Sequence, residues 1–232
     1  MNTSESYLFE YDKTLQLYHT GPSGECTITA LCRFAQESAG RHAERLGFGM
    51  TRLGRLGIAW VLREQAMQVL RFPVLGETLR VQTWPTHAER LLCHRDFRIL
   101  DGEGRVVALG TSAWFGLDLE SRRPRKAESF FSLPWDLLPA PAFGEPLSEL
   151  ETPAETAPSE SRVVRVSDID ALGHMNNLRY VDWVADHLEL FGIGGRCVRF
   201  VRIRHAREVM AGDGVVIRHE ADGQGGVRVA MS

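Results

Sequence analysis

Apolar residues three and four positions apart mark the first well-defined element of this chain. They run over residues 28–46, and this spacing is typical of an amphipathic helix. Thr27 or Thr29 can cap the start of this helix. Two glycines, Gly47 and Gly49, can end it. Because the apolar face is broad, we expect other elements to wrap around the helix.

Alternation of apolar and polar residues, which is typical of β-strands, follows this helix. The alternating segments are Ile58–Leu70, Thr78–Trp84, Leu91–Leu100 and Val106–Leu117, with a looser one at Tyr7–Leu17 before the helix. The sequence Asp101-Gly102-Glu103-Gly104 is a hairpin signal between two of these segments. The first half is therefore predicted to be one helix followed by four consecutive antiparallel strands.

The same order of elements recurs in the last third of the chain. A short strand at Val163–Val166 precedes a helix at about 177–191. Glycines then lead to a long strand at Cys197–Met210 and a turn at Gly212-Asp213. This internal duplication predicts two similar halves, although their sequence identity is low.

We therefore predict an α+β fold in which two domains follow each other in tandem. Each domain is expected to be a curled antiparallel sheet around a central helix. The predicted boundaries are 1–118 for the first domain and 161–232 for the second. Residues 119–160 are rich in proline with weak periodicity, which predicts a linker.

Composition excludes several classes of protein. The net charge of −3 gives no whole-molecule field toward nucleic acid or membrane. The scattered cysteines form no Cys-x-x-Cys pair, which argues against a zinc site or a disulfide framework: Cys26, Cys32, Cys93 and Cys197. No apolar run approaches the roughly 20 residues of a membrane span, and no signal peptide precedes the first helix, so we expect a cytoplasmic protein.

Candidate chemistry is concentrated in Asp168–Tyr180, between the short strand and the second helix. This segment holds two carboxylates, an imidazole and two carboxamides, interrupted by Gly173. Such polar groups are costly to bury unless each finds a partner. The first half has no equivalent segment, which favours a chemical role over a scaffolding one. Asp168 itself is expected to be an ordinary turn or surface residue.

Three stretches of the sequence resemble a known family. They are Gly57–Arg63 with the Phe72-Pro73, Gly76-Glu77 and Val81–Trp84 segments, Ser112–Phe115 with Arg122–Pro124, and the polar segment with Glu208 after it. Together they resemble the acyl-acyl-carrier-protein thioesterases of bacterial type, which have a tandem hotdog fold. The resemblance covers nearly the whole chain in order.

The sequence departs from the family pattern at two places. The plant members have an asparagine two residues after the loop aspartate, where this chain has Leu172. A leucine side chain cannot form a hydrogen bond, so Asn176 or Asn177 is a candidate replacement. Val227–Met231 corresponds to the penultimate strand of the family, and a last strand is expected to be missing.

The resemblance implies hydrolysis of fatty acyl-acyl-carrier protein to a free fatty acid, without a metal or cofactor. Asp170 would orient water or substrate, although a nucleophilic role stays open. His174 would bond a carboxylate or protonate the departing sulfur. Glu208 is the candidate general base. Asn176 or Asn177 would cap the second helix, whose first N–H groups can bind the developing oxyanion and substrate.

The resemblance also assigns acyl-chain binding to the first half and docking of the acidic carrier protein to basic residues. Trp60 and Met67 are candidates for the acyl slot, although either can simply fill the core. Candidate docking residues form two groups: Arg122, Arg123, Arg125 and Lys126 in one, and Arg202 and Arg204, with Arg199 and Arg207, in the other. Strand arginines can equally form a solvated face.

Alternatives remain at the level of function. An acyl-CoA thioesterase of the same fold is the nearest enzyme alternative. A non-catalytic acyl-binding or dehydratase-like module is the alternative from another class, and Leu172 would then report lost hydrolysis. Neither the preferred acyl length nor the choice between monomer and homodimer follows from the sequence, and no nucleic-acid or membrane partner is expected.

Overall fold

The computed structural model describes residues 7–133, 140–142, 150–194, 198–223 and 225–232. The chain forms two compact units. The first unit comprises Met1–Glu145 and Arg199–Arg204, and the second comprises Pro146–Val198 and His205–Ser232. The segment 119–160, predicted to be a linker, is thus divided between the two units.

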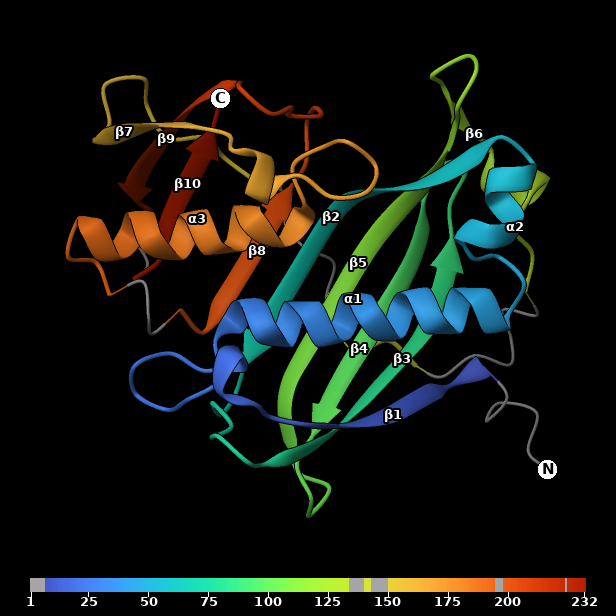
Figure 1. Ribbon diagram of the computed structural model, residues 1–232, viewed down its shortest axis with the longest axis horizontal. Coiled ribbons are helices and arrows are strands. Elements are labelled where there is room, and N and C mark those ends of the chain that lie inside the picture. The colour runs from blue at the N-terminus through green and yellow to red at the C-terminus, as the bar shows by residue number, and fades with distance from the viewer. Residues whose placement is uncertain (1–6, 134–139, 143–149, 195–197, 224) are drawn as a thin grey trace. The chain divides into compact units, whose positions relative to one another are not determined.

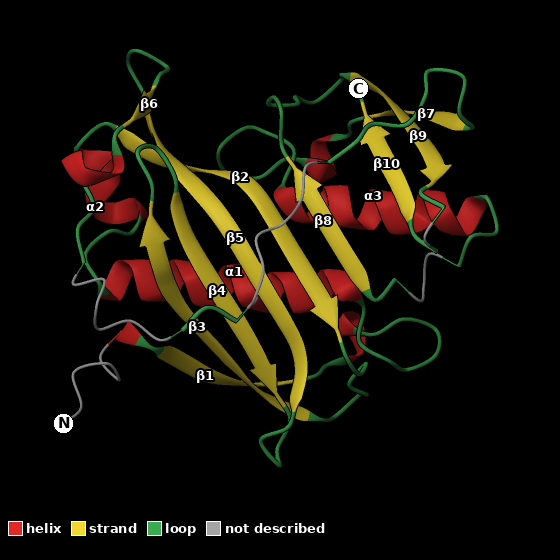
Figure 2. Cartoon of the chain, turned by 180° about the vertical axis from the view of Figure 1, so that it is seen from behind, coloured by secondary structure: helices red, strands yellow, loops and turns green. Residues whose placement is uncertain are grey.

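The first unit is an antiparallel sheet with a long helix against one face (Figures 1 and 2). Its strands are β1 (Phe9–Thr14), β2 (Ile58–Val69), β3 (Thr78–Ala88), β4 (Cys93–Leu100), β5 (Val106–Asp118), β6 (Pro124–Arg125) and β8 (Phe200–Arg204). The strand order is β1-β3-β4-β5-β2-β8, and β6 pairs with β5. The helices are α1 (Ile28–Arg45) and α2 (Met50–Arg55), with single 3-10 turns at Leu17–His19 and Ala127–Ser129.

Helix α1 confirms the prediction from periodicity. The hydroxyl of Thr27 accepts the N–H of Ala30 at 3.2 Å and caps the helix. Gly47, with φ +78°, follows its C-terminal end. Phe34 and Leu31 are fully buried, so the apolar face of the helix forms much of the core of this unit.

Strand order differs from the simple succession predicted from the sequence. β2 pairs with β5 on one side and with β8 on the other, whereas β3 lies between β1 and β4. The predicted strand Cys197–Met210 is shorter, because only Phe200–Arg204 continue the sheet; Cys197 lies outside the described residues. Glu64 of β2 forms ion pairs with Arg202 and Arg204 across this edge. Residues so distant in sequence leave no local signal of their pairing.

Segment 119–133 packs onto the first unit because it carries apolar side chains. Ala127 and Phe131 are buried together with Cys93, and Phe130 packs against them. β6 adds two pairs to the end of β5. The burial of these residues explains why this segment does not behave as a free linker.

A buried cation lies in the first unit. Arg95 of β4 is only 9% exposed, and its guanidinium donates to the Thr83 hydroxyl at 3.1 Å and to His42 Nδ1 at 3.0 Å. Burial lowers the pKa of Arg95 to about 10. Burial, followed by the charges of Arg95 and Arg45, lowers the pKa of His42 to about 3. Since a guanidinium can only donate, His42 is held neutral with its proton on Nε2.

The second unit is a smaller antiparallel sheet with one helix. Its strands are β7 (Ser159–Val163), β9 (Gly214–Ala221) and β10 (Val227–Met231), in the order β10-β9-β7, and its helix is α3 (Asn177–Leu190). The core contains Val164, Met175, Trp183, Val209, Val215 and Ile217. The strand predicted at Val163–Val166 ends instead at Val163, because a 3-10 turn begins at Val166. Among the described residues of either unit, no helix has the length and apolar character to cross a membrane.

The buried His42 predicts a pH dependence of stability. Its folded pKa of about 3 lies below the unfolded value near 6.5, so its contribution is complete above pH 6.5. As the pH falls from 6.5 toward 3, the unfolded state binds the extra proton, and stability falls by about 1.4 kcal/mol per pH unit from this group. Chemical denaturation of the full chain at a series of pH values measures this slope.

In His42→Asn, a carboxamide oxygen can still accept from Arg95 but does not titrate. We expect a lower stability at neutral pH and a flatter pH slope. Phe9, whose ring stacks on His42 with centroids 5.6 Å apart, supplies the control. Phe9→Leu should lower stability while leaving the slope intact. Equal slopes for His42→Asn and the parent chain would contradict the assignment.

Candidate active site

The polar segment of the second unit is a short hairpin that leads into α3. Ile169 and Met175 form an isolated antiparallel bridge. Within it, the Asp170 N–H donates to the His174 carbonyl, and the Gly173 N–H donates to the Asp170 carbonyl, both at 3.0 Å. Gly173 has φ +85°, a conformation that side chains other than glycine disfavour. The hairpin therefore fixes the backbone of Asp170 beside that of His174.

Both oxygens of the Asp170 carboxylate have partners. Oδ1 accepts the backbone N–H of Leu172 at 2.9 Å, and Oδ2 lies 3.5 Å from the Asn176 amide nitrogen. The Leu172 side chain itself is 51% exposed and takes no part. Of the two candidate replacements for the family asparagine, Asn176 is the residue that contacts the loop aspartate.

Asn176 is also the N-cap of α3. Its backbone is extended, and its side-chain oxygen accepts the Leu178 N–H at 2.9 Å. Asn177 is the first residue inside the helix, so it is not the cap. Within the part of the chain that the structure describes, the backbone N–H and the carboxamide of Asn177 make no hydrogen bond. They stay available to a ligand at the start of the helix.

Glu208 reaches the loop from the segment that precedes β9. The Met175 N–H donates to the Val209 carbonyl at 2.8 Å, which holds this segment against the hairpin. As a result, His174 Nε2 lies 3.3 Å from Glu208 Oε2. Both side chains are partly exposed, so solvent and substrate can approach them. The structure thus joins two residues that lie far apart in sequence.

Asp168 is buried, contrary to its expected place in an ordinary surface turn. Its carboxylate accepts the Arg165 N–H at 2.9 Å and lies 3.7 Å from the Arg179 guanidinium. Its carbonyl accepts the Asn176 N–H at 2.8 Å. Asp168 therefore holds the backbone of Asn176, the N-cap residue of α3, in place. The paired partner, Arg179 on the first turn of α3, is a supporting residue that sequence reasoning missed.

Tyr180 and His205 pack beside the loop. Their rings meet edge to face with centroids 4.9 Å apart. Burial raises the pKa of Tyr180, although the charge of Arg207 acts in the opposite direction. The phenol is thus kept neutral and can only donate or accept a hydrogen bond.

The candidate acyl-slot residues lie in the first unit. Trp60 donates from its indole nitrogen to the Phe48 carbonyl at 2.7 Å, and its ring packs edge-on against Phe130 and Phe131. Met67 is 2% exposed, and its methyl group lies close to Gly110. Met67 lies in the core, whereas Trp60 packs partly buried against the cluster of Cys93, Ala127 and Phe131, and the role of both in acyl binding stays a prediction.

The two groups of candidate docking residues differ in their exposure. Arg122, Arg123 and Lys126 are exposed, with Lys126 3.9 Å from Glu128, and Arg125 lies 3.7 Å from Asp118. By contrast, the side chain of Arg202 is only 7% exposed and pairs with Glu64. Arg204 pairs with the other oxygen of the same carboxylate at 3.0 Å. The first group is therefore the more accessible of the two, and docking at either group stays a prediction.

A second polar cluster links β7, α3 and β9 away from the loop. Glu160 lies 2.8 Å from His187 Nδ1, and His187 Nε2 lies 2.9 Å from His219 Nδ1. Burial alone would raise the pKa of Glu160, but hydrogen bonds from Arg162 and His187 outweigh it and lower that pKa. The ionised Glu160 accepts from His187 Nδ1, and His187 Nε2 shares a hydrogen bond with His219 Nδ1. This buried chain fastens α3 to the sheet.

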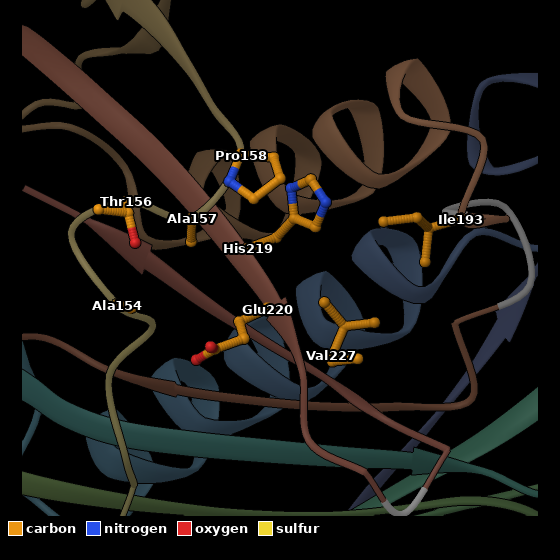
Figure 3. A pocket seen from close by; sticks show the side chains of 9 residues that line it. Ala154, Thr156, Ala157, Pro158, Ile193, His219, Glu220 and Val227 are labelled. Carbon is orange, nitrogen blue, oxygen red and sulfur yellow. The ribbon is translucent and has the colours of Figure 1, made fainter.

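His219 also lines a pocket of about 390 Å³ (Figure 3). The pocket lies between residues 154–158, Ile193 and strands β9 and β10. Burial and the neighbouring His187 lower the pKa of His219. None of the loop residues lines this pocket, so it is separate from the Asp170 site.

The sequence matches a known family and several individual relatives. The model of the acyl-ACP thioesterase N-terminal domain matches residues 6–131, and that of the C-terminal domain matches residues 151–229. The chain is 23% identical over 231 residues to oleoyl-acyl carrier protein thioesterase 1 of Arabidopsis thaliana, covering 91% of this chain and 63% of the relative. It is 25% identical over 198 residues to dodecanoyl-[acyl-carrier-protein] hydrolase of Cinnamomum camphora, covering 77% and 50%. The chain thus spans about half to two thirds of the length of these relatives.

Solved structures show the same architecture. An acyl-ACP thioesterase from Bacteroides thetaiotaomicron superposes with a TM-score of 0.86 at 23% identity, covering 99% of this chain and 93% of that one. The 12:0-ACP thioesterase from Umbellularia californica gives 0.79 at 20% identity, covering 97% and 98%. At these identities the likeness establishes the fold, which is the predicted tandem hotdog of α+β class. Since the two family models follow each other over most of the sequence, the chain belongs to the acyl-ACP thioesterase family.

Proposed function

We propose that this protein hydrolyses the thioester of fatty acyl-acyl-carrier protein and releases a free fatty acid and the carrier protein. The observation that carries the proposal is the contact between Glu208 and His174. His174 lies on the same loop as Asp170. Membership in the family supports the reaction class, and the names of the relatives support the substrate class.

The proposed reaction uses the pair as an acid and a base. Asp170 orients a water molecule toward the thioester carbonyl, and Glu208 accepts the proton of that water as the new C–O bond forms. When the tetrahedral intermediate collapses, the C–S bond breaks and His174 gives a proton to the departing sulfur. Proton transfer across the 3.3 Å contact between Glu208 and His174 then restores both groups.

The start of α3 would stabilise the negative charge that develops on the carbonyl oxygen. The N–H groups of Leu178 and Arg179 already bond to Asn176. The Asn177 N–H and carboxamide are the donors that remain for an oxyanion, and the positive end of the helix dipole adds to them. This assigns the capping role to Asn176 and the substrate contact to Asn177.

The carrier protein is the proposed partner because the exposed basic turn suits an acidic surface. Arg122, Arg123 and Lys126 are exposed on one short segment of the first unit. An acyl-CoA substrate would use the same loop but would not need this turn. A cytoplasmic location stays a prediction.

The acid–base assignment predicts large losses of turnover. Asp170→Asn and Glu208→Gln should each lower kcat on acyl-acyl-carrier protein by at least about 100-fold, because the first removes the carboxylate that orients the water and the second removes the general base. Release of free thiol measures the rate. Glu220→Gln, a glutamate substitution on β9 away from the loop, is the matched control and should keep the parent rate. If the parent chain releases no thiol from either acyl-acyl-carrier protein or acyl-CoA, the alternative of a non-catalytic acyl-binding module would be favoured.

The cap and the Asp170 contact of Asn176 should have separable effects on stability and on kcat. Asn176→Ala removes both the cap and the contact to Asp170, so it should lower stability by about 1 kcal/mol and also lower kcat. Asn176→Ser keeps a capping oxygen but cannot reach Asp170. It should keep nearly the parent stability while kcat falls. Thermal unfolding and steady-state kinetics measure the two effects, and a fully active Asn176→Ser would show that the contact to Asp170 is dispensable.

Charge reversal tests the docking turn. The double variant Arg122→Glu, Arg123→Glu should raise KM for acyl-acyl-carrier protein by about tenfold at low ionic strength and leave KM for acyl-CoA unchanged. Arg80→Glu, an exposed arginine on β3, is the matched control. Equal effects of the double variant on both substrates would place carrier-protein docking elsewhere.

A further inference from the structure

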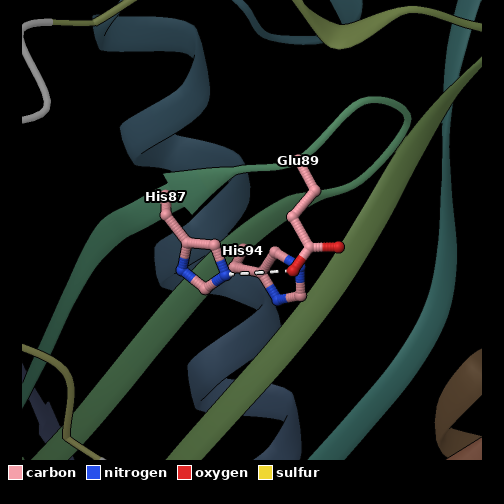
Figure 4. Close-up of side chains that lie close together, drawn as sticks. All are labelled: His87, Glu89 and His94. Atoms are coloured by element: carbon pink, nitrogen blue, oxygen red, sulfur yellow. Dashed lines mark ion pairs between the residues drawn. The ribbon is translucent and has the colours of Figure 1, made fainter.

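Three potential metal ligands meet at the end of the β3–β4 hairpin in the first unit (Figure 4). They are His87, Glu89 and His94, and one ligand atom from each lies within 4.8 Å of the other two. None of them belongs to the catalytic loop. The sequence shows no cysteine-based metal motif.

The hairpin itself brings these side chains together. Ala88 pairs with Cys93, and the Glu89 N–H donates to the Leu92 carbonyl at 2.8 Å to close the turn. The strand register shifts between Pro85 and Ala88, which is an irregularity of the bulge type. Bulges re-aim side chains, and here the irregularity lies where His87 meets His94.

The distances within the cluster do not suit hydrogen bonds. Glu89 Oε1 lies 3.7 Å from His87 Nε2 and 3.9 Å from His94 Nε2, beyond the range of about 2.7–3.2 Å for N–H···O bonds. In a tetrahedral zinc site with bonds of about 2.0–2.1 Å, neighbouring ligand atoms lie roughly 3.3–3.5 Å apart. The two contacts to Glu89 therefore need to close by only a few tenths of an ångström, whereas the two imidazole nitrogens, which lie within 4.8 Å of each other, need to close by up to about 1.5 Å to share a zinc ion.

The two imidazoles stack face to face with centroids 4.0 Å apart. Because the lone pairs of an imidazole lie in the plane of its ring, the exposed His87 ring must turn out of this stack for both nitrogens to point at one ion. His94 Nε2 is buried and has no hydrogen-bond partner in the described part of the chain. A buried ring nitrogen without a hydrogen-bond partner is a suitable ligand for a cation.

His87 also has an outer contact that suits a metal ligand. Its Nδ1 lies 3.2 Å from the Thr86 hydroxyl, which leaves Nε2 to face Glu89. Metal-bound histidines commonly use one ring nitrogen for the metal and the other for such a hydrogen bond. Imidazole and carboxylate together favour zinc over calcium or magnesium.

We propose that His87, Glu89 and His94 bind one Zn²⁺ ion, with a water molecule in the fourth position. His87 and Glu89 are about half or more exposed, so this position faces solvent. The bound ion would clamp the end of the β3–β4 hairpin. The site is independent of the proposed hydrolysis, because no residue of the Asp170 loop takes part.

The test uses the full chain, free of any histidine tag and treated with a chelator. Isothermal titration with Zn²⁺ should show one site per chain, and Co²⁺ should give the visible absorption of tetrahedral coordination. His87→Ala and Glu89→Gln should each weaken Zn²⁺ binding by more than about 100-fold, since even outer contacts of a metal site are worth 10–100-fold. His87 is exposed, so His87→Ala is expected to fold, which thermal unfolding without metal verifies.

Glu103→Gln is the matched control, because Glu103 is an exposed glutamate at the turn of the next hairpin. It should bind Zn²⁺ as the parent chain does. Zn²⁺ should also raise the Tm of the parent and of Glu103→Gln, and leave the Tm of His87→Ala unchanged. No Zn²⁺ binding by the parent chain, or binding that survives both His87→Ala and Glu89→Gln, would overturn the proposal.

Discussion

The side chain of Asn176 is the contact on which the geometry of the loop depends. Its oxygen caps the start of α3 by accepting the Leu178 N–H, and its nitrogen approaches the Asp170 carboxylate. One planar carboxamide thus fixes the distance between the start of the helix and the acid. The Asp168 carbonyl accepts the Asn176 N–H and holds the backbone of this residue in place. Without this contact, the helix start and the acid would no longer be placed by the same group.

The first unit buries a charged side chain of its own. Arg95 is buried there beside Thr83 and His42, and all its described partners are neutral. Burying a guanidinium costs free energy unless its N–H donors have hydrogen-bond partners. Arrangements of α1 against the sheet that move His42 away from Arg95 are therefore disfavoured. We infer that this contact helps to set which face of α1 meets the strands. The loop of the second unit, in contrast, leaves His174 and Glu208 partly open to solvent.

Much of the fold follows from local patterns, because helices and strands repeat their side-chain directions over short distances. α1 and α3 match the predicted helices, and the Asp101 hairpin joins β4 to β5 as expected. The pairing of β2 with β8 does not follow, since it joins residues far apart in the sequence.

Within the site, residue types could be predicted but their contacts could not. Glu208 is identified as a candidate by a family resemblance and not by spacing, and its approach to His174 is seen only in the structure. The choice of Asn176 over Asn177 as the cap depends on one backbone conformation, extended at Asn176 and helical after it. The pairing of Arg202 with Glu64 likewise depends on the tertiary position of β8, so its burial has no sequence signal.

Leu172 shows how the loop can keep its chemistry while losing a polar side chain. Asp170 Oδ1 accepts the backbone N–H of residue 172, and any residue except proline supplies that donor. The side chain at this position is exposed, so leucine there adds no buried, unsatisfied group. The second carboxylate oxygen is served by Asn176. The substitution therefore moves the side-chain support for Asp170 to the helix cap, and it removes the main sequence argument against hydrolysis.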